Sequence, residues 1–75
     1  MNEHEASCFI EALIFSAEEP LAKESMKKML VDYGNFDLDK ILDQLKKSYN
    51  NRGIQLIELD KKFFFRTSIN LQNFL

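Results

Sequence analysis

The sequence predicts one small α+β domain in which three helices precede a two-stranded β-hairpin. Apolar residues recur at helical spacing in three segments, and the single proline and the two glycines fall between or after these segments. From Ile54 onward the spacing changes to that of strands. In a chain of 75 residues, this order is typical of a winged helix-turn-helix, in which the third helix is the recognition helix and the hairpin is the wing.

The first predicted helix is the most apolar segment; it begins between Glu3 and Ala6 and runs to about Glu18. Pro20 ends this region, because its ring disfavours helical geometry in the preceding residue. One stripe of the helix carries apolar residues at i, i+3, i+4 and i+7: Ile10, Leu13, Ile14 and Ala17. Further apolar residues fill most of the circumference: Phe9, Ala12 and Phe15. We therefore expect either a central core helix or a core helix with one face left for a partner.

The second predicted helix spans about Ala22 to Val31 and is weakly capped, because Ala22 has no side-chain oxygen. We expect an outer i, i+4 pair between Glu24 and Lys28. Gly34 suits the chain reversal that follows a helix. The apolar side of the helix consists of Met26, Met29 and Leu30.

The third predicted helix runs from Leu38 to Tyr49 behind Asp37, the best N-cap residue of the sequence. Asp43 and Lys47 are spaced to pair on its outer surface. Its apolar face repeats for three turns: Leu38, Ile41, Leu42, Leu45 and Tyr49.

The predicted hairpin pairs Ile54 to Leu59 with Lys62 to Thr67 across a short turn. Strict alternation fails at Leu56-Ile57 and along Phe63 to Phe65, so we expect either a bulge or partial cover on both faces. Residues 68–75 read as the opening of a further element.

Four segments together resemble the segregation and condensation protein B (ScpB) family: IEALIFSAEEPL at 10–21, LKKSY at 45–49, RGIQLIEL at 52–59 and FFFRT at 63–67. The resemblance extends over about residues 9–67, in the family's order and spacing. It implies a winged-helix domain at 1–67, with 68–75 as the start of a linker or connecting element. Members of the family usually carry a second winged-helix domain after this point.

The resemblance also implies a non-enzymatic role in chromosome condensation and partition during the cell-division cycle. The family's N-terminal domains pair as a homodimer, which binds a kleisin subunit (ScpA-like) and, through it, a structural-maintenance-of-chromosomes ATPase. The chain is therefore expected to be cytoplasmic and nucleoid-associated.

The residues themselves offer little support for catalysis. His4 and Cys8 stand at i, i+4, but no third ligand follows to complete a tetrahedral metal site, and Cys8 has no base partner other than His4. We expect Cys8 to be a small buried or interfacial residue. The sequence has no glycine-rich phosphate loop, and it has no apolar run of the roughly 20 residues that span a bilayer. We expect no enzyme activity, cofactor, metal or membrane contact.

The main alternative is a small winged-helix transcriptional regulator that binds DNA. Residues 1–39 carry an excess of acids and residues 40–75 an excess of bases, within a net charge of −2. Acidic residues at the start of the third helix would repel phosphate, so we expect direct DNA contact to be weak or absent. The candidate nucleic-acid contacts are Lys46, Arg52, Lys61, Lys62 and Arg66.

Self-association follows from the amount of apolar surface. The first helix has more apolar side chains than one small core can cover, and Phe64 alternates with its neighbours and so points away from that core. The predicted dimer-interface residues are Phe9, Leu13 and Phe64.

Overall fold

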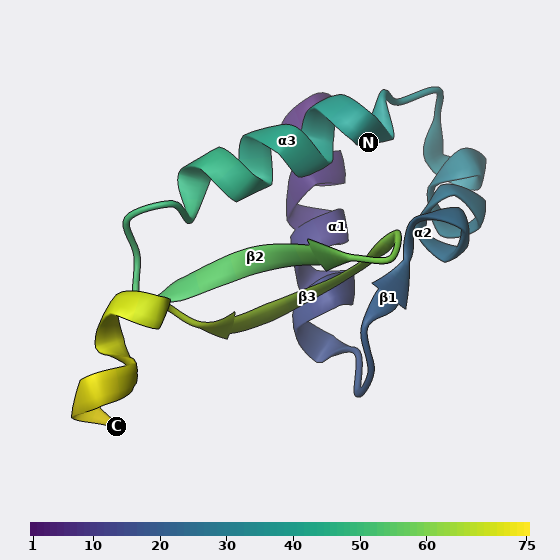
Figure 1. Ribbon diagram of the computed structural model, residues 1–75. Helices are drawn as coiled ribbons and strands as arrows, with labels where there is room; N and C mark the ends of the chain where they lie inside the picture. Colours follow the sequence, from purple (N-terminus) through teal and green to yellow (C-terminus); the bar gives the residue numbers. More distant parts are fainter.

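A computed structural model describes residues 1–75. Figure 1 shows α1 crossing behind the β2–β3 hairpin, α2 beside the tip of this hairpin, and the C-terminal η2 projecting beyond its other end. The elements in chain order are α1 (Glu3–Ser16), β1 (Leu21–Ala22), α2 (Lys23–Leu30), η1 (Val31–Tyr33), α3 (Leu38–Ser48), β2 (Ile54–Leu59), β3 (Lys62–Thr67) and η2 (Ile69–Phe74).

The helix ends follow from their capping residues. Asn2 and Glu5 form a reciprocal capping box that starts α1, and Asp37 caps α3 by accepting from the backbone N–H of Lys40. Ala22 offers no side-chain cap to α2, as its residue type predicts. The helix α1 ends at Ser16, two residues before the predicted Glu18, because Ala17 already has an extended backbone.

The sheet is antiparallel with strand order β1-β3-β2, so the predicted two-stranded hairpin has a third, very short strand beside it. Leu21 and Ala22 pair with Phe63 and Lys62. The hairpin strands have the predicted bounds, and Asp60 and Lys61 both have positive φ (54° and 62°), as a two-residue type I′ turn requires. The α+β winged-helix class is confirmed, with this one addition.

The core lies between α1, α2, α3 and the inner face of the hairpin. It consists of Ala6, Ile10, Ile14, Met26, Leu30, Leu38, Ile41, Leu42, Leu45, Leu56 and Phe63. Met29 was predicted on the apolar side of α2, but it is 43% exposed, because only Met26 and Leu30 face the other helices. The hairpin register is regular, and both Ile57 and Phe64 on its outer face are half-buried. The broken alternation therefore reflects partial cover on both faces and no bulge.

Gly34 shows why the chain can reverse between η1 and α3. Its φ is 143°, a conformation that side chains rarely adopt, and a Cβ atom there would lie 2.9 Å from the Phe36 ring. A larger residue at this position would strain the backbone and would force the Phe36 ring to shift.

Candidate functional site

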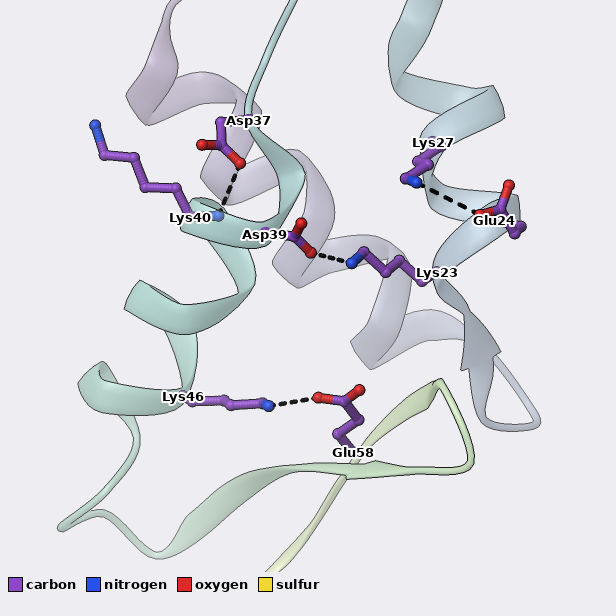
Figure 2. A network of polar contacts seen from close by, with 8 residues as sticks. All are labelled: Lys23, Glu24, Lys27, Asp37, Asp39, Lys40, Lys46 and Glu58. Carbon is purple, nitrogen blue, oxygen red and sulfur yellow. Dashed lines mark hydrogen bonds and ion pairs between the residues drawn. The ribbon is translucent and has the colours of Figure 1, made fainter.

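The first candidate site is the exposed surface of α3, the helix that would face DNA in a winged-helix regulator. Each lysine of α3 forms an ion pair within the chain. Lys46 Nζ lies 2.6 Å from Glu58 Oε1 on β2 (Figure 2), and Lys47 Nζ lies 3.1 Å from Asp43 Oδ2, the pair expected from the sequence. Lys40 Nζ lies 3.9 Å from Glu3 Oε2 on α1. Each lysine of this helix therefore has an acid of the same chain beside it.

The N-terminal end of α3 is also part of this network. Figure 2 shows Lys23 of α2 hydrogen-bonded to Asp39 in the first turn of α3. This hydrogen bond is the main reason that the pKa of Asp39 is lowered and the pKa of Lys23 is raised. Asp39 therefore stays ionised at the point where a recognition helix would approach phosphates and bases.

A pair predicted on α2 is wrong in detail. Glu24 bonds to Lys27, with 3.4 Å between Nζ and Oε1, and not to Lys28. Both partners are exposed, and the i, i+3 spacing serves as well as i, i+4 on a helix surface.

The five predicted nucleic-acid contacts come from α3, the loop after it, and β3 with its turn. Lys46 bonds to Glu58, and its Nζ also lies 5.4 Å from the centre of the Phe63 ring. The Arg52 guanidinium lies 5.9 Å from the centre of the Tyr49 ring. The other three are on β3 or its turn, where Lys61, Lys62 and Arg66 are exposed.

The three predicted dimer-interface residues are half-buried within the single chain. Phe9 packs edge-to-face against Tyr33 of η1, with ring centroids 5.4 Å apart, and Leu13 packs against the core. Phe64 lies instead beside a hollow at the end of α1, near Phe15. Their role in self-association stays a prediction.

The second candidate site is an apolar face between α1 and the hairpin. Phe15 is 75% exposed there, and the neighbouring Ala12 is exposed as well. The predicted site residues did not include Phe15, although the helical spacing of α1 places it off the Ile10–Ile14 stripe. This spacing was the signal that could have identified it.

A polar link crosses the inner end of this face. The Tyr49 hydroxyl at the end of α3 donates to the Glu11 carboxylate of α1. This bond, with partial burial, raises the pKa of the Tyr49 phenol. The Tyr49 ring also packs edge-to-face against Phe65, with ring centroids 5.0 Å apart. Tyr49 therefore connects α1, α3 and the wing.

The His4–Cys8 pair lies on the outside of α1. Cys8 was expected to be buried or interfacial; it is exposed in the single chain, so burial within the chain is wrong and an interfacial position stays a prediction. Its Sγ lies 3.6 Å from Nε2 of His4. No group of three or more His, Cys, Asp or Glu side chains is placed to hold a metal ion. None of the helices has the length and apolar character that crossing a membrane requires.

Comparison with known proteins places this fold in a family. Among solved structures, the chain resembles a conserved hypothetical protein from Chlorobium tepidum, with a TM-score of 0.76 and 22% sequence identity. The match covers 95% of this chain but 46% of that one, so the chain spans about half the length of its structural relative. No curated protein matches the chain. A family profile described as "Segregation and condensation complex subunit ScpB" matches residues 8–75. The chain therefore belongs to the ScpB family of segregation and condensation complex subunits.

Proposed function

We propose that this chain is a non-enzymatic scaffold domain of a bacterial condensin-like complex. In this role it forms a homodimer and helps to bind the kleisin subunit, which connects it to a structural-maintenance-of-chromosomes ATPase. Residues 1–67 form the winged-helix domain, and residues 68–75 begin the connection to a second domain. The complex acts on the nucleoid, in the cytoplasm.

The observation that carries this proposal is the neutralised surface of α3. A winged-helix regulator needs free basic side chains on its recognition helix to neutralise DNA phosphates. Here Lys40, Lys46 and Lys47 each pair with an acid of the same chain. A helix of this kind supports a role in protein assembly more than one in DNA recognition.

The test is a titration of the chain with duplex DNA at two salt concentrations. A scaffold domain is expected to bind weakly, with little change between the two concentrations, because few phosphate contacts form. Tight binding that falls steeply with salt would contradict the proposal and favour the transcriptional regulator.

Self-association is tested separately with Phe64→Arg, using sedimentation to follow the dimer and denaturant unfolding to follow the fold. We expect dimer dissociation to rise by about tenfold or more, because an arginine would be desolvated at the interface. The fold should weaken less, because Phe64 is only half-buried in the single chain. Val31→Arg is the control, because Val31 is 68% exposed on η1. An equal loss of association and of stability in Phe64→Arg would show that Phe64 is a core residue.

A further inference from the structure

The apolar face between α1 and the hairpin contains two adjoining hollows of about 260 Å³ and 270 Å³. Both hollows include Phe15 and Phe65 in their walls, so they adjoin at these two side chains. The first is completed by Glu11, Ala12, Tyr49 and Ile54, and the second by Ile14, Ala17, Glu18, Glu19, Pro20 and Phe64. We call the two hollows together the Phe15 groove.

The size of the Phe15 groove suits individual side chains. Each hollow is smaller than the roughly 300–1,000 Å³ of small-molecule pockets. Two hollows beside one exposed aromatic ring instead fit two large apolar side chains from one turn of a helix, as in other helix-in-groove complexes.

The charge at the Phe15 groove is of one sign. Glu11, Glu18 and Glu19 line it, and no lysine or arginine does. Glu11 bonds to Tyr49, but Glu18 and Glu19 form no ion pair with any base of the chain. Most lysines of the helices form ion pairs with other acids, so the carboxylates of Glu18 and Glu19 are available to a basic group of another molecule.

We propose that the Phe15 groove binds an amphipathic helix of a partner protein, with apolar anchors on one face and lysine or arginine beside them. The apolar anchors would fill the two hollows, and the basic side chains would meet Glu18 and Glu19. Phe64, a predicted dimer residue, lines the second hollow, so the partner helix would lie beside the proposed interface between copies. The exposed apolar segment η2 of a second copy fits less well, because residues 69–75 contain no lysine or arginine. This inference rests on the proposed scaffold role and specifies the chemistry of the partner segment.

The test measures the binding of labelled synthetic peptides to the chain by fluorescence anisotropy. The first peptide is a helix of about four turns, with leucines at i, i+3, i+4 and i+7 and lysines on the flanks. The second replaces each lysine with glutamate. We expect the basic peptide to bind and the acidic peptide to bind at least about tenfold more weakly, because like charges would meet at Glu18 and Glu19.

Two variants remove the apolar part of the Phe15 groove. Phe15→Ser is expected to lower the affinity of the chain for the basic peptide by about tenfold or more, because the ring contributes most of the apolar contact. Ala12→Arg blocks the first hollow by size and charge, and serves as the second variant if Phe15→Ser does not fold. Val31→Ser is the matched control, because Val31 is 68% exposed and Phe15 is 75% exposed.

A third variant removes the charge. Glu18→Gln with Glu19→Gln is expected to lower the affinity for the basic peptide by about threefold and to reduce the salt dependence of this affinity. Asp32→Asn with Asp60→Asn changes the net charge equally at positions outside the groove, and should have little effect.

The inference is overturned if both peptides bind equally, or if Phe15→Ser and Ala12→Arg leave binding unchanged. It is also overturned if the basic peptide does not bind while Phe15→Ser converts a dimer into a monomer in sedimentation, because the groove would then be an interface between copies. None of these results changes the DNA titration, so the scaffold role is judged separately.

Discussion

The surface of α3 and the Phe15 groove differ in whether their charged side chains have partners within the chain. On α3, the lysines at positions 40, 46 and 47 form ion pairs with acids of α1, β2 and α3 itself. At the groove, Glu18 and Glu19 have no basic partner, and the adjacent aromatic ring is exposed. A surface that pairs its own charges offers little attraction to a polyanion. A surface with unpaired charges of one sign and exposed apolar area offers both attraction and contact.

The largest expected effect separates residues that hold the fold from residues that face a partner. Ile10 is fully buried in α1, and Phe15 on the same helix is 75% exposed. Ile10→Ala should lower the free energy of unfolding by about 2–5 kcal/mol, because it leaves a cavity in the core. Phe15→Ala should change it by less than about 0.5 kcal/mol. Urea denaturation followed by circular dichroism measures both, and similar losses would mean that the Phe15 ring belongs to the core.

The next effect concerns Tyr49, which lies between the two faces. Tyr49→Phe should lower the free energy of unfolding by about 1–2 kcal/mol at neutral pH, because the Glu11 carboxylate loses its donor. Tyr33→Phe is the control, because the Tyr33 ring packs on Phe9 but its hydroxyl has no hydrogen-bond partner in the chain, and it should change little. Equal losses in the two variants would show that the Tyr49–Glu11 bond does not stabilise the fold.

The Tyr49–Glu11 bond also predicts a pH dependence. The pKa of Tyr49 is raised in the folded chain, so the folded state keeps this phenol proton at pH values where the unfolded state releases it. The stabilisation is complete below the ordinary tyrosine pKa of about 10, and it is lost as the pH rises through the folded pKa. The difference between the wild type and Tyr49→Phe should therefore shrink above about pH 10. A difference that stays constant or grows in that range would contradict this assignment.

The smallest effect tests whether the ion pairs of α3 lower its affinity for DNA. Asp39→Asn, Asp43→Asn and Glu58→Gln together free Lys23, Lys46 and Lys47. We expect duplex DNA affinity to rise by about five- to tenfold at low salt, with a log–log salt slope of about −2 to −3, because up to three phosphates are neutralised. The control is Glu18→Gln, Asp32→Asn and Asp60→Asn, which changes the net charge equally elsewhere. An equal gain in both variants would show that net charge matters and position does not.

The elements that repeat a period were predictable from the sequence. The face of α3 that contains Leu38 and Leu45, the hairpin bounds and the Asp37 cap follow from local spacing and residue type. The strand β1 was not predicted, because two residues carry no period and Leu21–Ala22 becomes a strand only through pairing with β3. The capping box of Asn2 and Glu5 was readable from its spacing, but the prediction did not use it.

In the candidate sites too, contacts within one helix were predictable from the sequence and contacts between elements were not. The Asp43–Lys47 pair was predicted because both residues lie on one helix. The pairs Lys23–Asp39 and Lys46–Glu58 join different elements, so no local spacing indicates them. From the sequence alone, α3 carries several basic residues with no assigned partners, whereas the fold places an acid beside Lys23 and another beside Lys46.

The short strand β1 has a further consequence for Glu18 and Glu19. These residues sit in a connection of a few residues, held by α1 on one side and by the pairing of Leu21 with Phe63 on the other. Directly after β1, the backbone N–H of Lys23 donates to the carbonyl oxygen of Lys61 at 3.2 Å, which ties the start of α2 to the hairpin tip. Much of the chain entropy of this segment is therefore lost during folding and not at the moment of association. In the proposed complex, Glu18 and Glu19 could therefore meet a basic partner with a smaller entropy cost than the same residues on a flexible loop.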